Sequence, residues 1–103
     1  MLISLKIPEN LKLDPDNLAE WQFFLQACTN RRVLGEYRYG LPKKRQKYMS
    51  RLARELQAYK KTGNAEQLFN IAVYAFLESC QPENKKIHWD NTVDSVTRGE
   101  FGV

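Results

Sequence analysis

Residues 43–77 read KKRQKYMSRLARELQAYKKTGNAEQLFNIAVYAFL, and this stretch decides the fold. Gly63 suits the left-handed position at which helices commonly end. Asn64 is a favourable cap for the helix that follows, with Gln67 three residues later. The sequence therefore predicts two helices, over residues 44–62 and 65–79, joined at Thr62-Gly63-Asn64.

The helix expected over residues 44–62 is amphipathic and basic. Its apolar side chains recur at offsets of 0, 1, 4, 8 and 11, which is a helical stripe. They are Tyr48, Met49, Leu52, Leu56 and Tyr59. Lysine and arginine fill the remaining faces. Lys43 and Lys44 would lie at the helix N-terminus, where the macrodipole disfavours positive charge, and this favours a functional reason for the charge.

The helix expected over residues 65–79 is apolar on nearly all sides, because only Asn70 interrupts the apolar run from Leu68 to Leu77. Such a helix is either central in a fold or part of an oligomer interface. We expect a homo-oligomer through this helix. The candidate contacts are Phe69, Val73, Phe76 and Leu77. Asn70 needs a partner if it is buried. A structural hydrogen bond, to Tyr74 or across a dimer axis, and a ligand contact are both open.

A third, shorter helix is predicted over residues 16–30. Asp14 can cap it, Pro15 fits its first turn, and Asn30 to Arg32 would end it. A broad apolar face follows at helical spacing, and we interpret it as core. Its members are Leu18, Trp21, Phe24, Leu25 and Cys28. The whole chain, residues 1–103, is then one all-α domain with an extended arm (1–15), a helical core (16–80) and an irregular tail (81–103).

The tail begins after Gln81-Pro82, and its apolar residues Ile87 and Trp89 are expected to anchor it on the helices. His88 is the only histidine, and we interpret it as a surface or hydrogen-bonded residue. The polar run that contains Arg98 is by default a mobile tail. Its alternative is a flap that brings Arg98 to an anion.

Positive charge is concentrated in the middle of the chain. Residues 31–61 hold eleven Lys or Arg against two acidic residues, whereas residues 1–30 and 62–103 are each net negative. Such a block binds an anion or repels itself in water, unless the acidic flanks fold back on it. Within it, residues 31–42 are predicted to be a loop that combines tyrosines and arginines, bounded by Gly35, Gly40 and Pro42. The alternative is a solvated loop whose tyrosines lie on the helices.

We predict that this block binds an anionic, nucleotide-like ligand by charge and stacking. The candidate ligand-binding residues are Tyr37, Arg38, Tyr39, Arg45, Lys47, Tyr48, Arg51, Arg54, Asn70 and Arg98. The second hypothesis is a nucleic-acid-binding protein that uses the same basic helix. We expect no cofactor.

Catalytic and metal-binding patterns are missing from the sequence. It contains no phosphate-binding glycine loop, no nucleophile next to a base and no zinc-type spacing, so we expect a non-enzymatic protein without a metal. Cys28 and Cys80 are interpreted as small, buried hydrophobic residues with reduced thiols, and a disulfide between them is the alternative. No apolar run is long enough to span a bilayer and the N-terminus does not resemble a signal peptide, so a soluble, cytoplasmic protein with no membrane partner is expected.

The stretch from Leu56 to Ala75, with its Tyr-x-x-Thr-Gly-Asn turn and Asn-x-Ala-x-Tyr-Ala core, resembles a family of small uncharacterised helical proteins of phages and bacteria. The later residues His88, Thr92, Asp94 and Ser95 are similar to that family's tail. The resemblance covers residues 45–99. It implies a phage-linked accessory role, and an anti-defence protein that sequesters a signalling nucleotide is its concrete form.

The hairpin is also remotely similar to the second half of the all-α nucleoside triphosphate pyrophosphohydrolases of the MazG type. That resemblance implies magnesium held by acidic residues of two helices. Here Asn70 stands where an acid is expected, and Arg51 and Arg54 lie beside a lone Glu55. A cationic site repels magnesium, so the resemblance implies a nucleotide pyrophosphohydrolase only as a third hypothesis.

Overall fold

The protein is all-α. The computed structural model describes residues 9–12, 14–40 and 47–90, and in these ranges it contains three helices and no strand. Helix α1 spans Pro15–Tyr39, α2 spans Tyr48–Thr62 and α3 spans Glu66–Cys80. The predicted three-helix fold is therefore confirmed.

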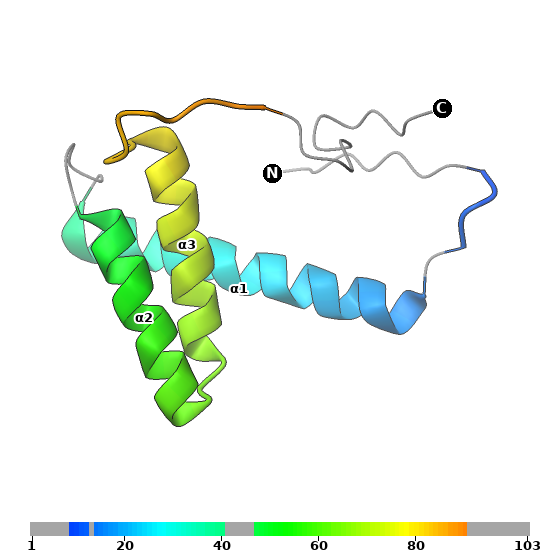
Figure 1. Cartoon of the computed structure of the whole chain (residues 1–103). Helices are drawn as coiled ribbons and strands as arrows, with labels where there is room; N and C mark the ends of the chain where they lie inside the picture. Colours follow the sequence, from blue (N-terminus) through cyan, green and yellow to red (C-terminus); the bar gives the residue numbers. More distant parts are fainter. Residues whose placement is uncertain (1–8, 13, 41–46, 91–103) are drawn as a thin grey trace.

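Helix α3 is the central element. It forms an antiparallel hairpin with α2, and α1 crosses that hairpin (Figure 1). Both outer helices pack against α3, whereas no Cα atoms of α1 and α2 lie within 8 Å of each other. Two outer helices that share one apolar neighbour explain why α3 is apolar around most of its circumference.

Helix α1 is longer than predicted, so the expected end near Asn30 is wrong, and the expected loop over residues 31–42 is wrong for residues 31–39. Residues 41 and 42 lie outside the described residues. Asp14 caps the helix as predicted, since its Oδ1 accepts a hydrogen bond from the Asp16 amide at 3.1 Å. Gly35 lies inside the helix, although glycine costs about 1 kcal/mol there. The helix ends only at Gly40. This residue has a positive φ of 78°, and its amide N–H donates a hydrogen bond to the Glu36 carbonyl.

The last turns of α1 are held by side chains that the sequence analysis had assigned to a loop. Arg32 pairs with Glu36 one turn later, with 2.6 Å between Nη2 and Oε1, and its guanidinium lies 5.6 Å from the centre of the Phe76 ring. Arg31 pairs with Glu66 of α3 at 3.3 Å. These contacts favour a continuous helix over a break at Asn30.

Helix α2 starts later than predicted. Lys47 is the N-cap residue with a non-helical ψ of 66°, so the helix begins at Tyr48 and not at residue 44. Residues 43–46 are outside the described residues.

The turn between α2 and α3 is the one that the sequence predicts. Gly63 has a φ of 69°, and its amide N–H donates a hydrogen bond of 2.7 Å to the Tyr59 carbonyl. Asn64 Oδ1 accepts a hydrogen bond from the Glu66 amide at 3.0 Å, directly ahead of α3, whose N-cap residue is Ala65. The Thr62 hydroxyl donates a hydrogen bond of 2.9 Å to Oε1 of Gln67 across the turn. The two helices are thus joined by a turn with most of its polar groups paired.

The apolar stripe of α2 faces α3 only in part. Tyr48 is buried, and Leu52 and Tyr59 are half-buried. Met49 and Leu56 are exposed by 47% and 37% respectively. They therefore form a flank beside the contact with α3, which corrects their assignment to one stripe.

The predicted self-association surface on α3 is largely used inside the chain. Phe69 contacts Phe23 and Phe24 of α1, and Leu77 is among the few buried residues. Val73 is half-buried, and Phe76 is half exposed beneath Arg32. Phe69 and Leu77 thus have contacts within the chain, and self-association through α3 stays a prediction.

Glu78 fixes the segment that follows α3. Its carboxylate is buried and accepts hydrogen bonds from the amides of Glu83 and Asn84 at 3.0 to 3.1 Å. Residues 81–90 form an irregular segment, as predicted. Ile87 and Trp89 are about half exposed in it.

Cys28 and Cys80 are not joined to each other; Cys28 is half-buried and Cys80 is exposed, so the prediction of burial is wrong for Cys80. Burial of Cys28 in α1 raises the pKa of its thiol. Among the described residues, no helix has the length and apolar character to cross a bilayer.

Candidate anion-binding site

Four cations lie along one flank of α2, and we call them the basic flank. Lys47 is the N-cap, and Arg51, Arg54 and Lys61 follow at helical spacing, with only Ala58 interrupting the row. Residues three, four and seven apart share a helix face, so the register places these side chains in one row. All four are exposed.

Three of the four cations of the basic flank have no ion pair with another described residue. These are Lys47, Arg54 and Lys61. The acidic start of α1 does not fold back on α2, since no Cα atom of α1 lies within 8 Å of one of α2. A row of exposed like charges is favourable to an anion that neutralises it.

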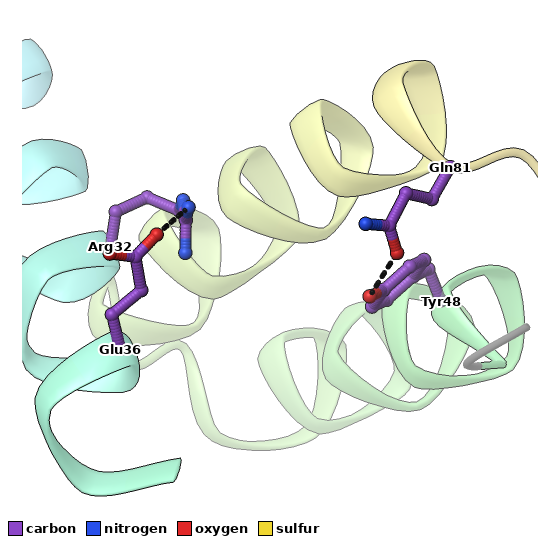
Figure 2. A network of polar contacts seen from close by, with 4 residues as sticks. All are labelled: Arg32, Glu36, Tyr48 and Gln81. Atoms are coloured by element: carbon purple, nitrogen blue, oxygen red, sulfur yellow. Dashed lines mark hydrogen bonds and ion pairs between the residues drawn. The ribbon is translucent and has the colours of Figure 1, made fainter. Parts of the chain in front are cut away.

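Tyr48 does not belong to this site. Its side chain is only 2% exposed, and its hydroxyl lies 3.4 Å from Oε1 of Gln81 at the end of α3 (Figure 2). A ring enclosed between two helices has no face open to a base. The predicted stacking role of Tyr48 is therefore corrected, and its role is to hold α2 against α3.

Tyr37, Arg38 and Tyr39 lie in the last turn of α1 and not in a loop. The two tyrosines are exposed by 88% and 82%. Residues two apart on a helix point about 200° apart, so these rings project to different sides. They can stack with ligands singly, but the helix does not present them as a pair.

Two predicted ligand residues, Arg45 and Arg98, are outside the described residues. Asn70 lies on α3, where its Oδ1 is buried with no hydrogen-bond partner in the described part of the chain. The expected bond to Tyr74 is therefore not formed there. The structure thus brings together Lys47, Arg51 and Arg54, adds Lys61, and places Asn70 and the α1 tyrosines elsewhere.

Sequence reasoning missed a second surface feature, on α1. A shallow, open depression of about 280 Å³ is lined by Asn17, Glu20, Trp21 and Phe24. The Trp21 and Phe24 rings are nearly parallel, at 4°, with centroids 6.1 Å apart. The apolar spacing of this region was assigned to core, and only the position of α3 reveals that Trp21 remains 56% exposed.

Among residues 9–12, 14–40 and 47–90, no three His, Cys, Asp or Glu side chains gather as a metal site would require. No protein-family model, curated protein or solved structure matches the chain. The resemblances to phage proteins and to MazG-type enzymes remain predictions.

Proposed function

We propose that the protein binds an anionic ligand without converting it, and that the basic flank of α2 supplies the contacts. The observation that supports this is the row of exposed cations at Lys47, Arg51, Arg54 and Lys61 on one side of one helix. Arginine and lysine at such spacing suit a series of phosphate groups. Arginine can contact a phosphate bidentately, and lysine contacts it as a point charge.

The shape of the basic flank favours an extended ligand with many phosphate groups, such as single-stranded nucleic acid. From Lys47 to Lys61 the row runs along roughly 20 Å of helix axis, because each residue advances about 1.5 Å. A single nucleotide spans only part of that length. An exposed helix flank is convex, whereas small-molecule sites are usually concave. Nucleic acid binding, the second hypothesis from the sequence, is thus the form that the geometry favours.

Capture of one nucleotide is the second candidate, and the exposure of Tyr37 and Tyr39 favours it. Either ring offers a face of the kind on which bases stack, with Arg38 between them in sequence. The phage-type anti-defence role, in which a signalling nucleotide is sequestered, is a special case of this candidate. It rests on the resemblance in residues 45–99.

Binding is tested by fluorescence anisotropy with a labelled 12-nucleotide single strand, over a series of salt concentrations. Four phosphate contacts predict a log–log salt slope of about −3. Arg54→Glu combined with Lys61→Glu should weaken binding at least tenfold and make the slope shallower. Lys86→Glu is the matched control, since Lys86 is exposed and lies on the segment after α3.

The two candidates separate in the same experiment. A strand that binds with the predicted slope supports the polyanion form. If a mononucleotide at equal phosphate concentration displaces the labelled strand, and if Tyr37→Ala or Tyr39→Ala abolishes this displacement, the result supports the nucleotide form. Equal weakening by the control and the flank variants would contradict the role of the basic flank. Magnesium-dependent turnover of a nucleoside triphosphate that is lost in Glu55→Gln would instead support the pyrophosphohydrolase hypothesis.

A further inference from the structure

The first turns of α1 carry an aromatic surface that the other described residues cover only in part. They project past α3 in Figure 1, and the aromatic contacts between α1 and α3 start only at Phe23. The depression lined by Asn17, Glu20, Trp21 and Phe24 lies on this part of the helix. A Trp exposed by 56% beside a stacked Phe is apolar surface that water solvates poorly.

The chemistry of this depression suits a cationic side chain with an apolar stem. Trp21 and Phe24 offer ring faces, which attract a cation, and Glu20 offers a carboxylate next to them. Glu20 has no ion pair or hydrogen bond with any described residue. Asp14 and Asp16 add negative charge in the preceding turn. The matching occupant is therefore a surface that combines methylene or methyl groups with lysine or arginine.

The chain displays such a surface on α2, on the side away from the basic flank. Met49, Ala53, Leu56 and Lys60 follow at offsets of 0, 4, 7 and 11, so they share one face, which we call the apolar flank. All four are exposed. Lys60 has no ion pair with a described residue, and its long stem can lie on an aromatic ring.

These two surfaces lie apart within one chain, because no Cα atom of α1 lies within 8 Å of one of α2. We propose that they meet between two copies, with the α1 depression of each copy on the apolar flank of the other. Glu20 of one copy then pairs with Lys60 of its partner copy, and Trp21 covers Met49 and Leu56. A two-fold axis repeats the same contact twice, which is the commonest symmetry of soluble oligomers.

The area is sufficient for a small interface. At their exposed fractions, Trp21, Met49 and Leu56 offer on the order of 300 Å² of apolar surface in each copy. A specific interface at the small end buries about 600 Å² a side, of which somewhat more than half is apolar. The expected dimer is therefore weak, with a dissociation constant in the micromolar range.

Charge reversal tests this pairing. Sedimentation velocity from about 1 to 200 µM should show the wild-type chain changing from its monomer mass of 12.1 kDa to twice that mass. Glu20→Lys alone and Lys60→Glu alone should each stay monomeric, because each variant opposes like charges at the interface. An equimolar mixture of the two variants should dimerise again, because both pairs of opposite charge are restored between unlike chains.

The controls separate this interface from folding and from anion binding. Trp21→Ala should be monomeric with an unchanged helical circular dichroism signal, and Arg54→Glu on the basic flank should dimerise like wild type. A wild-type chain that is monomeric at 200 µM would overturn the proposal and leave the depression to another occupant. It is equally overturned if either single charge reversal dimerises normally, or if the mixture stays monomeric.

Discussion

The Phe24 and Phe69 rings meet edge to face, with centroids 5.3 Å apart and an interplanar angle of 62°. Phe23 approaches the same Phe69 ring at 6.3 Å. Edge-to-face pairs of this kind add about 0.5–1.5 kcal/mol to the burial of the rings. One side chain of α3 thus holds two neighbouring aromatic residues of a helix that buries no residue fully.

Phe69→Ala should therefore detach α1 more effectively than any other single truncation on α3. We expect a loss of about 2–4 kcal/mol in the free energy of unfolding, measured by urea denaturation. Phe76→Ala is the matched control and should cost less than about 1 kcal/mol, since Phe76 is already half exposed. Similar losses for the two variants would contradict the anchoring role of Phe69.

Gly35→Ala should stabilise the protein by about 0.5–1 kcal/mol. The position is helical, an added Cβ meets no atom within 4 Å, and alanine is the better helix former. Thermal unfolding followed by circular dichroism measures the shift. Gly63→Ala is the contrasting variant and should destabilise by about 1 kcal/mol or more, because its φ is positive. A destabilising Gly35→Ala would indicate that α1 breaks there in solution.

Asn70→Leu should leave the free energy of unfolding unchanged or raise it by up to about 1 kcal/mol. The Asn70 Oδ1 is buried without a partner in the described part of the chain, and removing such a group removes its desolvation cost. Asn70→Ala tests the effect of side-chain volume. It should lower the free energy of unfolding, because the smaller side chain leaves a cavity. A clear loss of stability in Asn70→Leu, measured by urea denaturation, would show that Asn70 has a structural partner.

Cys28 should react with an alkylating agent much more slowly than Cys80. Burial holds the pKa of the Cys28 thiol above its ordinary value of 9.0, so little thiolate is present at pH 8, whereas Cys80 is exposed. The rate at Cys28 should rise about tenfold for each pH unit below that pKa. Single-thiol variants Cys28→Ser and Cys80→Ser, compared by mass spectrometry before and after denaturation, measure each rate. Equal rates in the folded protein would contradict the burial of Cys28.

The hairpin could be predicted because its signals are local. Gly63 and Asn64 lie within one turn of the bonds that they make, so the sequence alone contains the geometry. The length of α1 could not be predicted in the same way. Gly35 is a helix breaker only by intrinsic propensity, and Arg31 and Arg32 outweigh it through Glu66 and Phe76, which are more than 30 residues away.

The sequence predicted which types of residue the candidate site contains, but only part of where these residues lie. Arg51 and Arg54 share a flank because helical register fixes it, and Lys61 follows from the same register. Tyr48 was misassigned because an aromatic next to cations looks the same in sequence whether it packs on Gln81 or faces solvent. The surface of α1 at Trp21 could not be predicted, because it depends on how far α3 extends along α1.

The lack of contact between α1 and α2 has a consequence for how substitutions combine. Within the described residues, each outer helix packs on α3 and no Cα atom of one outer helix lies within 8 Å of the other, so a change at the α1–α3 contact and a change at the α2–α3 contact can influence each other only through α3. Where the two changed residues lie more than about 10 Å apart and touch no common side chain of α3, their effects on the free energy of unfolding should add to within about 0.5 kcal/mol. Evolution can therefore alter the basic helix and the aromatic helix separately, provided that α3 continues to fit both.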